Sequence, residues 1–130
     1  MSRDLILCVD DEKLVLRVCS IAVGEAGYRA ELADSGVGGL NAFACLQDEI
    51  CLVVSDIVMP GSLNGIEMVE RIVKIKPTVE ILMMTGYSDT MVGLQGGNRF
   101  PLIRKPFLPA ELVTKIRSIL NSAHKAEKPR

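Results

Sequence analysis

In this chain of 130 residues, the segment Leu5-Ile6-Leu7-Cys8-Val9-Asp10-Asp11 is the strongest indication of the fold. Five apolar residues in a row end in two acids, and apolar side chains then recur at helical spacing through residues 14–26. A short apolar run followed by a helical pattern is typical of a parallel strand that is buried on both faces. Sites in doubly wound sheets form outside the carboxyl ends of the strands, so Asp10 and Asp11 are predicted to lie in such a crevice.

A second apolar run, Cys51-Leu52-Val53-Val54-Ser55, ends in Asp56. The three carboxylates are therefore expected to meet at one edge of the sheet. Carboxylates at close range repel each other unless a cation or a proton joins them. A small set of oxygen ligands suits Mg²⁺, and Lys105, which follows a further apolar run, offers a second positive charge. The pattern predicts a metal-binding acidic pocket.

Simpler interpretations of the same acids stay open on these residues alone. Asp10, Asp11 and Glu12 also suit the N-terminus of a helix, where acids cap free N–H groups and complement the helix dipole. Asp56 also suits a turn. Because Asp56 ends a buried run and is not at a helix start, it favours the pocket over the capping interpretation.

The rest of the chain alternates strand and helix patterns. Strands are expected over residues 5–9, 28–33, 51–55, 79–84 and 100–104, and helices over 14–26, 35–46, 64–76, 88–97 and from 109 onward. The residues of the first helix expected to face the core are Leu14, Val15, Val18, Cys19, Ala22, Val23 and Ala26. The helix over 88–97 is expected to be weak because its three glycines lower helix propensity. Alternation of this kind implies a parallel sheet between two layers of helices, with right-handed crossovers.

Length and composition indicate a single domain, expected over residues 1–123 with a flexible tail over 124–130. The formal net charge of −1 and the hydrophobic content of 48% argue against a disordered chain and against a nucleic-acid binder. Neither a signal peptide nor a run of membrane-spanning length is recognisable, so a cytoplasmic location is expected. The four cysteines lack CxxC spacing and are expected to be free core thiols: Cys8, Cys19, Cys45 and Cys51.

Five short motifs occur in the order Asp10-Asp11-Glu12, Asp56-x-x-Met59-Pro60, Asn64-Gly65, Thr85-Gly86 and Lys105-Pro106-Phe107. With these motifs the chain resembles the receiver domain of two-component response regulators, over about Asp4 to Ala123. The resemblance implies a flavodoxin-like, doubly wound α/β fold with a five-stranded parallel sheet in the order 2-1-3-4-5 and helices on both faces. It also implies Mg²⁺-dependent phosphorylation of one aspartate.

The resemblance assigns a role to each matching residue. Asp56 is implied to be the phosphoacceptor, and Asp10, Asp11, Asp56 and the Val58 carbonyl are implied to hold Mg²⁺. Thr85 and Lys105 are implied to complete the site, and the Lys105–Pro106 peptide bond is expected to be cis. The domain is not expected to be an enzyme in its own right, although a receiver can promote its own phosphorylation and dephosphorylation.

The partners implied are a sensor histidine kinase or a histidine phosphotransfer protein. A downstream protein, a covalently attached kinase and a weak homodimer are further alternatives, and neither nucleic acid nor a membrane is expected as a partner. The chain can be a stand-alone regulator, a phosphorelay intermediate or one domain of a hybrid sensor kinase. The last alternative agrees with the loop Pro60–Gly65, which is one residue longer than the commonest form in the family.

Besides the longer loop, a second departure from the family pattern lies at Leu102. Leu102 stands where the family usually has a switch aromatic, and Phe100 lies two residues earlier, so the sequence does not predict an aromatic switch coupled to Thr85.

Two rival functions stay open. One is an interaction domain that works without phosphorylation. The other is an aspartate-nucleophile phosphatase, which Val58 disfavours because such hydrolases typically carry a second acid at that position.

Overall fold

The structure is a computed structural model that describes residues 4–86 and 100–127. Strands and helices alternate along the described chain. The elements are β1 (Leu5–Val9), α1 (Lys13–Glu25), β2 (Arg29–Ala33), α2 (Gly36–Leu46), β3 (Ile50–Asp56), α3 (Gly65–Ile75), β4 (Glu80–Thr85), β5 (Leu102–Arg104) and α5 (Pro109–Glu127). The helix expected over 88–97 lies outside the described residues.

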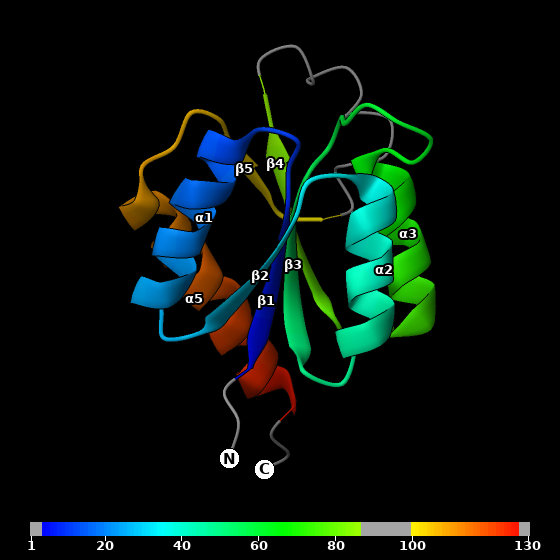
Figure 1. Ribbon diagram of the computed structural model, residues 1–130. Coiled ribbons are helices and arrows are strands. Elements are labelled where there is room, and N and C mark those ends of the chain that lie inside the picture. The colour runs from blue at the N-terminus through cyan, green and yellow to red at the C-terminus, as the bar shows by residue number, and fades with distance from the viewer. Residues whose placement is uncertain (1–3, 87–99, 128–130) are drawn as a thin grey trace.

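The five strands form one parallel sheet in the order β2-β1-β3-β4-β5. Figure 1 shows α1 and α5 on one side of the sheet and α2 and α3 on the other. The predicted α/β class, strand order and three-layer arrangement are therefore confirmed. The order of the strands changes direction at β1, which places the carboxyl ends of β1 and β3 side by side at the middle of the sheet.

Alternating strand residues divide the core into two layers. Leu7, Val9 and Val53 face the layer beneath α2 and α3, where Phe43 and Met68 are buried. On the opposite face, Ile6, Cys8, Leu52 and Val54 pack against α1 and α5. Strands that bury both faces read as continuous apolar runs, and this explains why β1 and β3 could be located from sequence alone.

The inward face of α1 differs from the expected one. Leu16 is buried, whereas Leu14 is 75% exposed. Cys19, Ala22 and Val23 face the core as predicted. Apolar residues occupy the three consecutive positions 14, 15 and 16, so periodicity alone fitted more than one orientation of the first turn. Packing of α1 against the sheet and α5 selected Leu16.

Local signals set the starts of two helices. The Ser35 hydroxyl accepts a hydrogen bond from Gly38 N–H at the start of α2. At the start of α3, Asn64 and Glu67 form a reciprocal capping box, with each side chain accepting from the other residue's backbone N–H. The last helix, α5, begins at Pro109 as predicted and extends to Glu127, past the expected domain boundary at residue 123.

The cysteines are free, but they are not all in the core. Cys8 and Cys19 are buried, Cys51 is partly buried and Cys45 is exposed on the outer face of α2. The expectation of four core thiols is therefore wrong for Cys45, because a small residue at a helical position is tolerated on either face.

No helix among the described residues is both long enough and apolar enough to cross a membrane.

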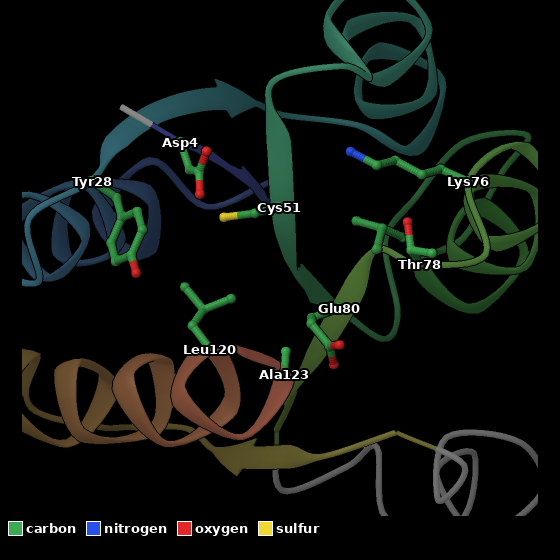
Figure 2. Close-up of a pocket in the computed structure, with 9 residues that line it drawn as sticks. Asp4, Tyr28, Cys51, Lys76, Thr78, Glu80, Leu120 and Ala123 are labelled. Carbon is green, nitrogen blue, oxygen red and sulfur yellow. The ribbon is translucent and has the colours of Figure 1, made fainter. Parts of the chain in front are cut away.

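A hollow of about 180 Å³ lies at the edge of the sheet where the strands begin (Figure 2). Its lining includes Asp4, Tyr28, Cys51, Glu80 and Leu120. Burial raises the pKa of the Cys51 thiol to about 12, and the Asp4 carboxylate adds to this rise, so the thiol stays protonated near neutral pH. This hollow is distant from Asp10 and Asp56, which lie at the opposite edge of the sheet.

Candidate functional site

Strand register brings the predicted acids together. Val9 of β1 is the partner of Ser55 of β3, so Asp10 and Asp56, the next residues along each strand, come level with one another. Neighbouring parallel strands lie about 5 Å apart, which brings the two carboxylates within reach of one ligand. Asp10 is 0% exposed and Asp56 is 5% exposed. Asp11 points to a more open position and is exposed.

Lys105 joins the two buried carboxylates. Its ammonium lies 2.9 Å from Asp10 Oδ2 and 3.3 Å from Asp56 Oδ1. The lysine reaches this position because its backbone N–H donates to the Thr85 carbonyl, which fixes the end of β5 against the end of β4. The Lys105–Pro106 peptide bond is cis, as predicted.

The surroundings of the pocket raise the pKa of both Asp10 and Lys105. Burial raises the pKa of Asp10, and hydrogen bonds from Lys105 and from Glu12 N–H only partly offset this rise. Burial by itself lowers the pKa of Lys105, but the hydrogen bond to Asp10 and the charges of Asp56 and Asp10 outweigh it, so the pKa is raised. Lys105 is therefore protonated at neutral pH and compensates part of the negative charge of the pocket.

Backbone packing fixes the position of Asp56. The Ser55 hydroxyl donates to the Asp56 carbonyl oxygen at 2.9 Å. Gly65 N–H donates to the Ile57 carbonyl, and a Cβ atom at Gly65 would overlap the Asp56 carbonyl oxygen. The Asn64-Gly65 motif thus has a structural reason: the start of α3 touches the strand end that carries Asp56, and only glycine leaves room for this contact.

Thr85 and Val58 lie at the same edge of the sheet. Thr85 is the last residue of β4, and its hydroxyl donates to the Gly86 carbonyl at 3.2 Å, a contact with local backbone. Val58 follows β3 by two residues, and its side chain is 45% exposed. Leu102 and Phe100 pack as partly buried residues against the layer of α2 and α3.

The carboxylates fit a hard divalent cation. Asp10, Asp11 and Asp56 each offer an oxygen, and these three oxygens lie within 4.8 Å of one another. An all-oxygen set supplied by few side chains suits Mg²⁺, which keeps several waters. The structure therefore brings together the three carboxylates and the lysine that were predicted from three separate segments of the sequence.

One residue of the site was not predicted to contact the lysine. The Glu12 carboxylate lies 3.7 Å from the Lys105 ammonium, and Glu12 N–H donates to Asp10 Oδ1 at 2.9 Å. From the sequence, Glu12 was interpreted as a possible helix-capping acid and as part of the Asp10-Asp11-Glu12 motif, with no contact to Lys105 predicted. Its position beside Asp11 was the available signal, but the direction of its side chain depends on where the β5 end brings Lys105.

Together the fold and the site define a class: a doubly wound α/β domain with an acidic pocket and a paired lysine at the carboxyl edge of its sheet. Comparison with known proteins gives the family. A family model described as the response regulator receiver domain matches residues 6–117. The chain belongs to this family, which forms part of two-component signalling systems.

Named relatives agree with this assignment. The DNA-binding response regulator MtrA of Mycobacterium tuberculosis is 33% identical over 121 residues, which is 91% of this chain and 51% of MtrA. The uncharacterized transcriptional regulatory protein YkoG of Bacillus subtilis is 32% identical over 124 residues, covering 92% of this chain and 52% of YkoG. This chain thus spans about half the length of these curated relatives.

Solved structures of similar size share the fold. A response regulator receiver domain protein from Clostridium thermocellum superposes with a TM-score of 0.83 at 26% identity, covering 95% of this chain and 98% of that one. A CheY-like receiver domain protein from Methanospirillum hungatei gives a TM-score of 0.79 at 30% identity, covering 96% of this chain and 99% of that one. Both share the fold of the described part of this chain.

Proposed function

We propose that Asp56 accepts a phosphoryl group, in a Mg²⁺-dependent reaction, from a phosphohistidine of a sensor histidine kinase or a histidine phosphotransfer protein. The observation that carries this proposal is the meeting of Asp10, Asp11, Asp56 and Lys105 at one edge of the sheet. A buried carboxylate beside a lysine and further acids has the groups that phosphoryl transfer requires, namely a nucleophile and charge compensation. Family membership supports a kinase partner in general.

In the proposed reaction an Asp56 carboxylate oxygen forms a bond to phosphorus. The bond from phosphorus to the donor histidine nitrogen breaks, and that nitrogen keeps the electron pair. Lys105 already lies beside Asp56 Oδ1, so its ammonium is placed to compensate charge on the transferring oxygens. When bound by Asp10, Asp11, Asp56 and the Val58 carbonyl, Mg²⁺ would supply further charge neutralisation.

The consequence proposed for phosphorylation is a change in the surface that the family resemblance assigns to β4, β5 and the segment between them, of which residues 87–99 lie outside the described structure. Thr85 ends β4, and its hydroxyl would exchange the Gly86 carbonyl for a phosphoryl oxygen. A downstream protein or an attached kinase would read this change, in the cytoplasm and without a direct role for nucleic acid or a membrane. DNA binding is named for MtrA, whose sequence this chain matches over about half its length.

The test is the intact mass of the chain after incubation with acetyl phosphate, with and without Mg²⁺. The wild-type chain is expected to gain one phosphoryl group only with Mg²⁺, and Asp56→Asn is expected to gain none. Asp34→Asn is a matched control, because it makes the same change at an exposed acid that is not one of the three clustered carboxylates. Gain of the group by Asp56→Asn, or no gain by a folded wild-type chain, would contradict the proposal and favour an interaction domain that works without phosphorylation.

A further inference from the structure

Among the residues that the structure describes, three carboxylates lie within 4 Å of the Lys105 ammonium, and they have different further roles. Asp10 and Asp56 lie 2.9 Å and 3.3 Å from its ammonium, and both are proposed metal ligands. Glu12 lies 3.7 Å away, at the outer rim of the pocket, with its side chain 66% exposed. Glu12 is thus the one partner among these three whose carboxylate is not already assigned to another task.

The place of Glu12 in α1 makes this contact informative. Glu12 is the N-cap residue of the helix, a position where a short polar side chain such as that of Asp or Ser ordinarily accepts a hydrogen bond from the backbone of the first turn. Its side chain makes no such capping bond. The carboxylate lies toward Lys105 instead, while the backbone N–H of Glu12 holds Asp10.

We propose that Glu12 is a positioning residue, which holds the Lys105 ammonium at the mouth of the pocket when the Asp10 carboxylate is used as a metal ligand. The inference rests on the proposed function. Asp10 cannot give the same oxygen fully to a cation and to Lys105, so a lysine that loses this contact needs another anchor to remain beside Asp56. Only the rim carboxylate of Glu12 is free to supply that anchor among the partners that Lys105 contacts in the described structure.

Positioning and simple charge repulsion predict opposite results for the same substitution. If Glu12 only added negative charge, Glu12→Gln would make the mouth less repulsive and speed the approach of an anionic phosphodonor. If Glu12 anchors Lys105, the same variant leaves the ammonium less well placed and slows transfer even when Mg²⁺ is saturating. The sign of the change therefore separates the two roles.

The experiment measures the rate of phosphoryl gain from acetyl phosphate by intact mass, at saturating Mg²⁺, for wild type, Glu12→Gln and Asp34→Asn. Asp34 is exposed and follows the end of β2 at the same edge of the sheet, so its variant removes the same charge away from Lys105. Glu12→Gln is expected to slow the reaction by about threefold or more, as suits a partly exposed ion pair, and Asp34→Asn to leave the rate nearly unchanged.

A second readout does not depend on phosphorylation. With Mg²⁺ and no donor, the two ε-methylene protons of Lys105 are expected to give distinct NMR signals in the wild type and to merge in Glu12→Gln. An unchanged or faster reaction in Glu12→Gln, or an unaltered Lys105 signal, would overturn the inference. No phosphoryl gain by the wild type would instead overturn the proposed function, and this inference with it.

Discussion

Lys105 is the residue on which the pocket depends most, because it compensates two carboxylates that are almost fully buried. Asp10 is 0% exposed and Asp56 is 5% exposed, and each lies within 3.3 Å of the same ammonium. Removal of one member of a buried ion cluster leaves the others without compensation, which costs more than the loss of a surface pair. The sequence suggested a lysine near these acids, and the structure shows that the pairing is direct.

Lys105→Met is expected to destabilise the metal-free domain by about 3 kcal/mol near neutral pH. The measurement is urea unfolding in the presence of a chelator. Lys74→Met is the control, since Lys74 is exposed in the last turn of α3, and it is expected to change stability by less than about 0.5 kcal/mol. A similar decrease in unfolding free energy in both variants would show that Lys105 compensates no buried charge.

The loss in Lys105→Met is expected to shrink as the pH falls. Burial raises the pKa of Asp10 in the folded state above its ordinary value of 3.8. Protonation of Asp10 therefore stabilises the fold fully below pH 3.8, and this stabilisation disappears as the pH rises through the higher folded pKa. Lys105 lowers the folded pKa, so in Lys105→Met the folded pKa is higher still and stability keeps falling up to a higher pH. Unfolding at about pH 5 and about pH 8 is the comparison, and an equal deficit at both would contradict the assignment.

The residues at which helices begin were easier to predict than the face that each helix buries. The capping residues Ser35 and Asn64 marked the starts of α2 and α3 correctly, because a cap acts on its own helix turn. The inward face of α1 was predicted with Leu14 in the core, and the structure has Leu16 there instead. Which of several adjacent apolar residues turns inward depends on the sheet and helix opposite, and local sequence carries no information on that contact.

Two glycines in helices are expected to respond oppositely to alanine. Gly65→Ala should destabilise the domain by about 2 kcal/mol or more, because its Cβ would overlap the Asp56 carbonyl, a backbone atom that cannot move aside. Gly24→Ala should stabilise it by about 0.5 to 1 kcal/mol, since no atom lies within 4 Å of the added carbon and α1 gains helix propensity. Urea unfolding midpoints measure both. Stabilisation by Gly65→Ala would refute the close packing of α3 on β3.

For the molecule as a whole, binding at the carboxyl edge is expected to stabilise the entire fold. The site draws its residues from β1, β3 and the end of β5, so a ligand held there selects the assembled sheet over the unfolded chain. This is a consequence of architecture, since no single element contains the site.

Mg²⁺ is expected to raise the unfolding free energy by about 2.7 kcal/mol at a concentration about 100 times its dissociation constant. Thermal unfolding over a Mg²⁺ series is the measurement. Asp11→Asn should lose most of this increase with little change in the metal-free stability, because Asp11 is exposed and lies beside the two buried acids. Asp34→Asn should keep the full increase. An equal rise in Asp11→Asn would mean that Asp11 does not bind the cation.

Local sequence patterns were enough to predict the alternation of strands and helices, the α/β class, and the acids at the ends of β1 and β3. These features follow from short-range patterns: apolar runs, helical spacing and capping residues. The order of the five strands was expected from resemblance to receiver domains, since nothing within one segment states which strand lies beside it.

The contacts that define the site depend instead on how the elements pack in three dimensions. The pairing of Val9 with Ser55 sets Asp10 level with Asp56, and the end of β5 brings Lys105 to both. The turn of Glu12 toward Lys105, the buried position of Leu16 and the exposure of Cys45 likewise depend on residues distant in the chain. The physical reason is common to all of them: side-chain direction and charge compensation depend on which elements pack together, and local sequence specifies the elements alone.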